Sequence, residues 1–265
     1  MADQVDASMP ALFLGHGSPM NAIEDSAFRR EWARVAAELP RPRAVLCVSA
    51  HWEARGIFVT SGESPETVHD FYGFPQALFD VRYPAPGDSA LAQEVASIFA
   101  AERAHLDPDR GLDHGAWSVL IAMYPRADVP VVQLSLDRTL SPAAHYELGR
   151  RLAPLRERGV LILGSGNVVH NLGVIDFGRE GGFDWAERFD DEVKRRIETR
   201  DHDALVRYAQ LGRDAALSIP TPEHYLPLLY VLALARPEEP IVHFNEAVTM
   251  GSISMRSLVI GAPRL

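Results

Sequence analysis

The stretch Ala11-Leu12-Phe13-Leu14-Gly15-His16-Gly17-Ser18-Pro19 passes from a short apolar run directly into a histidine flanked by glycines. Four apolar residues followed by Gly, Ser and Pro are typical of a buried strand that ends in a turn. The two glycines let the backbone turn sharply there. This stretch therefore predicts a strand that delivers His16 at its carboxyl end.

Working outward from this stretch, four more apolar runs predict buried strands: Ala44 to Ser49, Val129 to Leu136, Val160 to Leu163, and Ser257 to Ile260. Helical patterns lie between them. Ser26 to Leu39 stops before Pro40, Ser141-Pro142 begins a helix that Gly159 can end, and Thr221-Pro222 opens another. Strands alternating with helices predict an α/β fold with a mostly parallel central sheet flanked by helices on both faces.

No repeat, low-complexity block or long linker interrupts the 265 residues. We therefore expect a single catalytic domain over residues 1–265, with about the first eight residues as a flexible tail. The longest apolar stretches, such as Leu226 to Ala235, are too short to span a bilayer. Residues 1–10 do not resemble a secretory signal, so a cytoplasmic location and no membrane partner are expected.

Composition narrows the partner and the kind of site. The 26 Lys and Arg against 36 Asp and Glu give a formal charge of -10, which argues against a nucleic-acid partner. The single cysteine, Cys47, excludes an internal disulfide and any cysteine-rich zinc or iron–sulfur site. A metal would have to be bound by His, Asp or Glu, and the partner is expected to be a small molecule.

Two further predicted strands also lead into histidines. Val45 to Ser49 leads into His51, and Leu161 to Leu163 leads through a glycine-rich turn to His170. Ligands of a parallel sheet bind at the carboxyl ends of its strands, and histidines from separate loops can converge on zinc, copper or ferrous iron. Each histidine alone is more ordinarily a hydrogen-bonded loop residue; their repetition indicates a metal site.

Two more histidines are candidates. His224 falls in the first turn of the helix opened by Thr221-Pro222, where simple packing is the alternative interpretation. His114 occupies a loop before the apolar helix Trp117 to Met123, and Asp113 or Asp109 can orient its ring; a helix-capping loop is the alternative. The remaining histidines are expected mostly to face solvent or to cap: His69, His105, His145, His202 and His243.

The ordered set of motifs is similar to that of a known family. The motifs are Gly15-His16-Gly17-Ser18-Pro19, Ser49-Ala50-His51-Trp52, Asp113-His114-Gly115-Ala116-Trp117, Gly164-Ser165-Gly166-Asn167-Val168-Val169-His170-Asn171 and Pro222-Glu223-His224-Tyr225. Together they resemble the class III extradiol ring-cleavage dioxygenases, in particular the DOPA-dioxygenase-like subfamily. The resemblance runs from about His16 to the C-terminus.

The resemblance implies a mononuclear metal centre with His16, His51 and His224 as ligands. It implies Fe(II) for activity, although Zn(II) can occupy an all-histidine site in purified protein. His170 matches the family's acid/base and is a candidate fourth ligand, and the resemblance implies that His114 hydrogen-bonds either the substrate's hydroxyl or the bound oxygen. The implied reaction opens the ring of a DOPA-like catechol with O2 and gives a semialdehyde acid.

Some features leave the substrate pocket and the assembly open. Aromatic side chains near the motifs more ordinarily pack in the core, but they are also candidates for pocket walls: Trp52, Phe71, Tyr72, Phe74 and Tyr225. The segment from Ser61 to Pro86 is long enough to form a lid or an oligomer contact, so a homo-oligomer is one expectation.

Other functions are less well supported. A zinc hydrolase would use the same histidines to polarise a water molecule, and it is the main alternative. A dinucleotide site is suggested by Gly164-Ser165-Gly166, but Val169 stands in the third glycine position. Neither Ser18 nor Ser165 lies in the Gly-x-Ser-x-Gly motif of a serine hydrolase. A non-catalytic binding role predicts that no metal copurifies.

Overall fold

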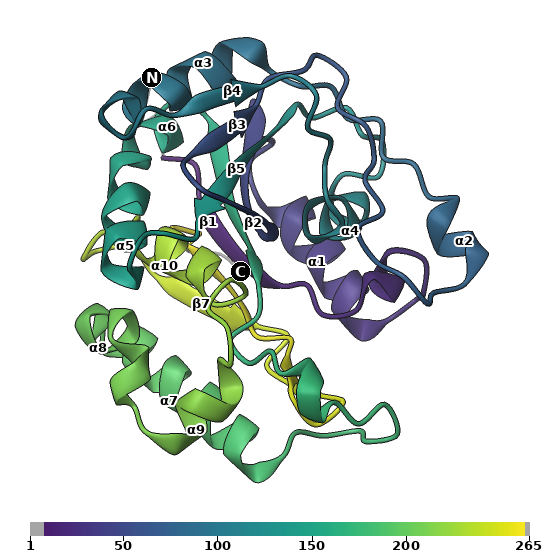
Figure 1. Cartoon of the computed structure of the whole chain (residues 1–265), viewed down its shortest axis with the longest axis vertical. Coiled ribbons are helices and arrows are strands. Elements are labelled where there is room, and N and C mark those ends of the chain that lie inside the picture. The colour runs from purple at the N-terminus through teal and green to yellow at the C-terminus, as the bar shows by residue number, and fades with distance from the viewer. Residues whose placement is uncertain (1–7, 263–265) are drawn as a thin grey trace, which may run out of the picture.

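A computed structural model describes residues 8–262, and its centre is an eight-stranded sheet (Figure 1). The strands are β1 (Ala11–Gly15), β2 (Ala44–Ala54), β3 (Phe58–Thr60), β4 (His105–Asp107), β5 (Val131–Asp137), β6 (Val160–Gly166), β7 (Ile241–Phe244) and β10 (Ser257–Ile260). Their order across the sheet is β4-β3-β5-β2-β6-β1-β10-β7. A separate two-stranded sheet pairs β8 (Val248–Thr249) with β9 (Ile253–Ser254).

The four central strands run parallel. β2 pairs with β5 on one side and β6 on the other, and β6 pairs with β1, all in parallel register. Antiparallel pairs lie further out, between β3 and β5, between β1 and β10, and between β10 and β7. The predicted mostly parallel sheet is confirmed, and its four parallel strands end at one edge.

Alternation along the central strands divides the interior into two cores. In β1, Ala11 and Phe13 belong to one core, whereas Leu12 and Leu14 belong to the other. Successive strand side chains point to opposite faces, so an unbroken apolar run is needed when both faces are covered. The β1 run has this pattern because neither of its faces meets water.

Helices cover both faces, as predicted. The core that contains Leu12 includes side chains of α1 (Ala27–Glu38) and α4 (His114–Met123). The opposite core includes side chains of α3 (Ser89–Ile98), α5 (Pro142–Arg151), α6 (Ala153–Arg156), α7 (Asp184–Glu198), α8 (His202–Val206), α9 (Arg213–Ser218) and α10 (Leu226–Leu232). The short α2 (Gln76–Phe79) lies in the long connection between β3 and α3.

Several element boundaries differ from the predicted ones. The β2 strand runs on to Ala54 through a register shift between Val48 and Glu53, so His51 lies within the strand and not after it. The helix expected from Thr221-Pro222 begins only at Leu226, and His224 lies in the turn before it. Pro227 is in the first turn of α10. A backbone N–H in the first turn has no partner within the helix, so a proline there costs no hydrogen bond.

Two predictions concern the chain as a whole. The expected N-terminal tail lies, apart from Ser8, outside the described residues. Within residues 8–262, no helix combines the length and the apolar character needed to cross a membrane.

Candidate metal centre and substrate pocket

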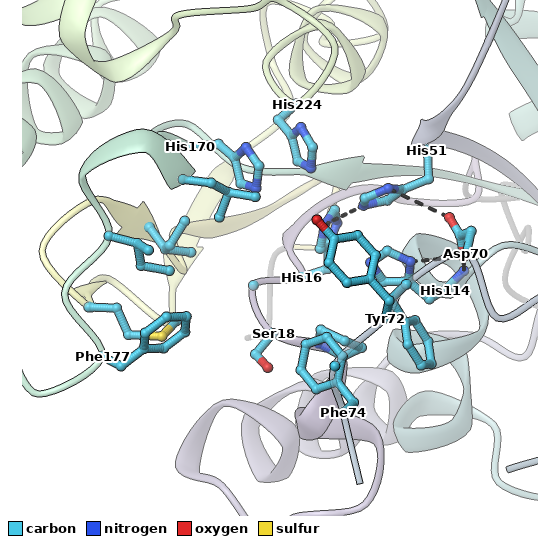
Figure 2. Close-up of a pocket in the computed structure, with 18 residues that line it drawn as sticks. His16, Ser18, His51, Asp70, Tyr72, Phe74, His114, His170, Phe177 and His224 are labelled. Atoms are coloured by element: carbon cyan, nitrogen blue, oxygen red, sulfur yellow. Dashed lines mark hydrogen bonds and ion pairs between the residues drawn. The ribbon is translucent and has the colours of Figure 1, made fainter. Parts of the chain in front are cut away.

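Three histidines from distant parts of the chain meet at the carboxyl edge of the parallel strands. His16 directly follows β1, His51 lies in β2, and His224 lies in the turn before α10. One ring nitrogen from each lies within 4.8 Å of the others, and the Nε2 atoms of His16 and His51 are 3.2 Å apart. These are the three residues predicted as metal ligands, and Figure 2 shows their rings grouped at the pocket.

Backbone hydrogen bonds to the end of β6 fix two of these histidines. The His16 N–H donates to the Gly166 carbonyl at 3.1 Å, and the Asn167 N–H donates to the His224 carbonyl at 2.8 Å. A Cβ atom on Gly166 would collide with that His224 carbonyl oxygen. Glycine at the end of β6 therefore allows the His224 turn to lie against the strand beside His16.

The hydrogen bonds at Nδ1 determine which nitrogen of His16 and of His224 carries the proton. Ser165 Oγ donates to the Gly115 carbonyl at 2.5 Å, so it accepts from His16 Nδ1, which lies 3.0 Å away. The Glu223 carboxylate accepts from His224 Nδ1 at 3.0 Å. Because Nδ1 is the donor in both rings, the lone pair of each Nε2 is free to bind a cation.

A carboxylate lies near Nδ1 of the third histidine, His51, beyond hydrogen-bond distance. This Nδ1 lies 3.7 Å from Asp70 Oδ2, while the Nε2 of His51 faces His16. Dashed lines in Figure 2 mark both contacts. The His51 N–H also donates to Ser49 Oγ at 3.2 Å, which holds the irregular part of β2 in place.

The donor set fits a divalent metal ion. Burial, followed by repulsion from neighbouring histidines, lowers the pKa of His16 and of His224 well below the ordinary value. Burial chiefly lowers the pKa of His51 to about 3. The His224 Nε2 atom is buried without a protein hydrogen-bond partner. Neutral imidazoles with convergent free lone pairs are what zinc and iron(II) sites require.

His114 belongs to the same cluster but has a different partner from the predicted one. It is the first residue of α4, not part of a loop, and its Nδ1 lies 2.9 Å from Asp70 Oδ1. The predicted partners are wrong: Asp109 makes no such contact, and Asp113 caps α4 by accepting from the Ala116 N–H at 3.1 Å. An N-cap side chain turns back towards its own helix, which leaves it unable to face the ring of the next residue.

Asp70 belongs to this histidine cluster, although the sequence did not indicate it. Burial alone raises the pKa of its carboxyl, but the hydrogen bonds and charge of His114 outweigh burial and bring that pKa to about 2. The carboxylate is therefore ionised; it accepts from His114 Nδ1 at 2.9 Å and lies 3.7 Å from His51 Nδ1. Asp70 lies beside His69 in an irregular segment, 44 residues before His114, and no motif in that segment indicates a contact between the two.

His170 lies beside this group. It follows β6, and its ring stacks on that of His224 with centroids 3.4 Å apart and an interplanar angle of 7°. Its nitrogen groups with Glu223 and His224 rather than with His16 and His51. Burial chiefly lowers its pKa to about 4, and within residues 8–262 neither ring nitrogen has a hydrogen-bond partner. The ring is thus free to exchange a proton with a bound molecule.

All five histidines line one cavity of about 510 Å³, a size that suits a small organic ligand. Among the predicted aromatic walls, Phe71, Tyr72 and Phe74 line it. Trp52 and Tyr225 do not and are instead buried in the interior. The Ser61 to Pro86 segment supplies the cavity wall through residues 70–74.

One histidine expected to face solvent is instead buried. His145 on α5 is fully inaccessible, and its Nδ1 lies 3.0 Å from the Tyr230 hydroxyl on α10. The sequence pattern was misleading because a polar helix face at this position packs against another helix. His145 does not line the cavity.

Comparison with known proteins agrees with this arrangement. Residues 10–252 match the family described as the catalytic LigB subunit of aromatic ring-opening dioxygenase. The 4,5-DOPA dioxygenase extradiol of Escherichia coli K12 is 50% identical over 96% of this chain and 95% of its own length. The Beta vulgaris protein of the same name is 37% identical over 84% of this chain and 85% of its own length.

A solved structure of an uncharacterised protein from Escherichia coli K12 matches the fold with a TM-score of 0.84 and 45% identity, covering 95% of this chain and 99% of that one. The resemblance found in the sequence motifs is confirmed by these matches over most of the chain. The chain therefore belongs to the LigB family and is a metal-dependent extradiol dioxygenase that opens the ring of a small aromatic substrate with O2.

Proposed function

We propose that this protein is an iron(II) enzyme that opens the ring of a DOPA-like catechol and forms a semialdehyde acid. In this proposal His16, His51 and His224 hold the metal. The observation that carries it is the convergence of their three side chains in a cavity that two further histidines share. The names of the relatives, 4,5-DOPA dioxygenase extradiol, supply DOPA as the first catechol to test.

The choice of iron over zinc follows from the reaction. Bound iron(II) would activate O2 and lower the pKa of a coordinated hydroxyl group, whereas zinc has no redox chemistry. An all-histidine site suits either ion. We therefore propose iron(II) in the active enzyme and expect zinc to compete for the same three nitrogens.

His170 is proposed as the acid/base. Its ring lines the cavity, and its nitrogens have no protein partner within the described residues. Burial keeps the ring neutral before substrate arrives, so it can accept a proton from a catechol hydroxyl and return it when the ring has opened. Its separation from the group of His16 and His51 favours this role over that of a fourth ligand.

His114 is proposed to bind the substrate through Nε2. Its Nδ1 proton is held by Asp70, so Nε2 presents a lone pair to the cavity and can accept a hydrogen bond from a catechol hydroxyl. The same Asp70 carboxylate contacts His51, so substrate binding and metal binding share one anchor.

The test is oxygen uptake by protein stripped of metal and reloaded anaerobically with iron(II) or with zinc. DOPA and other catechols should cause uptake and a new yellow semialdehyde absorbance in the iron form only. His51→Ala should abolish both, whereas His105→Ala, which removes an exposed histidine outside the cavity, should leave them unchanged. Tight stoichiometric zinc binding with esterase activity and no oxygen uptake would instead support a zinc hydrolase.

A further inference from the structure

One carboxylate oxygen holds His114 at two points. Asp70 Oδ1 accepts from the His114 backbone N–H at 3.0 Å and from its ring Nδ1 at 2.9 Å. His114 is the first residue of α4, so its N–H has no partner within the helix, and a carboxylate there also meets the positive end of the helix dipole. Because the backbone and the ring are bound to the same atom, the His114 side chain cannot rotate without losing a hydrogen bond.

The neighbouring rings restrict the plane of the His114 ring but not the position of its proton. The Phe71 ring meets it edge-on, with centroids 5.5 Å apart and an interplanar angle of 81°, and the His51 ring centroid lies 3.8 Å away. Within residues 8–262, Asp70 is the hydrogen-bond partner of the ring. Without that partner the proton is free to lie on Nε2, and a protonated Nε2 does not accept a hydrogen bond from a catechol hydroxyl.

The chain just before Asp70 is held in place without the clustered histidines. The Val68 N–H donates to the Leu112 carbonyl at 2.8 Å, and the Trp117 ring Nε1 donates to the Val68 carbonyl, also at 2.8 Å. Both bonds join this segment to the start of α4 and to the residues that lead into it. The Asp70 carboxylate is therefore brought to the His114 ring by contacts that do not involve a bound metal.

Asp70 is bound less closely to the candidate metal ligands than to His114. Its Oδ2 lies 3.7 Å from His51 Nδ1, beyond hydrogen-bond distance, and Figure 2 marks its contacts with both rings. We propose that Asp70 is a positioning residue that fixes the tautomer and the orientation of His114, and that it contributes more to catechol binding than to metal binding. The inference rests on the proposed function, in which His114 Nε2 accepts from a catechol hydroxyl.

The experiment measures catechol and zinc affinities of zinc-loaded variants, which do not turn over. Asp70→Ala should raise the Kd for unsubstituted catechol by about tenfold or more, as expected when a hydrogen bond to a charged group is lost, and should change the zinc affinity by less than about threefold. Asp70→Asn should raise the catechol Kd by about threefold at most, because the amide oxygen replaces Oδ1 as an acceptor. Asp80→Asn, at an exposed position on the same segment outside the cavity, should change neither affinity. A zinc affinity that falls as far as the catechol affinity, or equal losses in Asp70→Asn and Asp70→Ala, would overturn the inference.

A double-mutant cycle tests whether Asp70 acts through His114. His114→Ala should weaken catechol binding by itself. Asp70→Ala added to that variant should change the catechol Kd by less than about twofold, because two residues that act through one contact are not additive. A general loss of structure would instead weaken binding in both backgrounds. Equal effects of Asp70→Ala with and without the His114 ring would therefore contradict the inference.

The tautomer of His114 separates this inference from the proposed function. In nitrogen NMR spectra of the zinc-loaded protein without catechol, the His114 signals are assigned by their absence from His114→Ala. They should show a protonated Nδ1 and an unprotonated Nε2 in the wild-type protein and in Asp70→Asn, and this preference should be lost in Asp70→Ala. If no catechol is bound or consumed, the proposed function fails, and these spectra still decide the role of Asp70. An unchanged tautomer in Asp70→Ala would show that Asp70 does not position the ring.

Discussion

Two of the three clustered histidines are held at Nδ1 by chemically different partners. His16 donates to a serine hydroxyl, whereas His224 donates to the Glu223 carboxylate at 3.0 Å. A charged partner makes the opposite nitrogen a stronger donor to a metal than a neutral partner does. Glu223 in turn accepts from the Thr221 hydroxyl at 2.9 Å, so its orientation is fixed. The metal affinity should therefore depend on Glu223, although this residue does not line the cavity.

Replacement of Glu223 tests this dependence. Glu223→Ala should weaken iron(II) or zinc binding by about 10- to 100-fold, because His224 loses the group that sets its tautomer and raises its basicity. Competition with a chelator measures the affinity without any need for turnover. Glu223→Gln should lose less, since the amide oxygen still accepts from Nδ1. Glu180→Ala, an exposed control, should not change the affinity, and an unchanged affinity in Glu223→Ala would contradict the argument.

His170 can be distinguished from the metal ligands by measuring both the metal content and the rate of oxygen uptake of a variant. His170→Ala should lower kcat by about 100-fold or more, the usual effect of removing a general acid or base, while the bound metal remains stoichiometric. Metal content is measured beside the rate of oxygen uptake. A variant that loses its metal together with its activity would make His170 a ligand rather than the acid/base.

At the scale of elements, the approach of α4 to β2 determines where His51 lies. Gly115, in the first turn of α4, lies so close to β2 that a Cβ atom there would collide with Ser49 Oγ and come within 2.9 Å of His51 Cδ2. Ser49 cannot easily give way, because its hydroxyl donates to Asp113 at 2.7 Å. A side chain at position 115 would therefore push directly on a candidate ligand.

Gly115→Ala should consequently displace the His51 ring and weaken metal binding by about tenfold or more, although alanine is otherwise the better helix former. The variant is compared with Gly178→Ala, where the added Cβ would meet nothing closer than Asp176 Oδ1 at 3.5 Å. Metal affinity and thermal unfolding are measured for both. A Gly115→Ala protein with native metal affinity would show that His51 is not held by this contact.

Much of the sheet could be predicted because its central strands are rich in apolar residues, and β1 and β6 end in glycine. That pattern correctly located His16 at the end of β1 and His170 after β6. It missed the continuation of β2 through His51, since a register shift within a strand depends on its neighbours and has no local sequence signal. Asp70 was missed for a related reason: its partners come from other elements, and nothing in its own irregular segment indicates them.

At the scale of the whole molecule, one buried arginine joins distant segments. Arg156, 1% exposed at the end of α6, donates to the Met9 carbonyl before β1 and to the Leu234 carbonyl after α10. It also donates to the Glu239 carboxylate before β7, at 3.0 Å. Burial raises the pKa of the Glu239 carboxyl, but hydrogen bonds from Arg156 and from the Arg236 N–H outweigh burial and lower that pKa below its usual value.

This ion pair should make stability depend on pH in a definite direction. Because the Glu239 pKa is lower in the folded protein, its contribution is present above the unfolded value of about 4.3 and is lost as the pH falls towards the folded pKa. Glu239→Gln should therefore cost about 3 kcal/mol of unfolding free energy at pH 7 and less below pH 4.3.

Denaturant unfolding of both proteins across this pH range measures the difference. Glu238→Gln, at the exposed neighbouring position, should follow the wild-type protein at every pH. A Glu239→Gln difference that stays constant or grows on acidification would contradict the assignment of the carboxylate to this pair.

The central position of β1 has a consequence for how the protein is made. β1 lies between β6 and β10, and the Gly15 N–H donates to Ser257 Oγ, a partner 242 residues further along the chain. A ribosome-bound chain therefore carries His16 and His51 well before His224 and before the strand that completes the sheet around β1. Such an intermediate presents two of the three clustered imidazoles. The group of three histidines can therefore form only after residue 224 has been synthesised, and β1 gains its second neighbour only when Ser257–Ile260 follows.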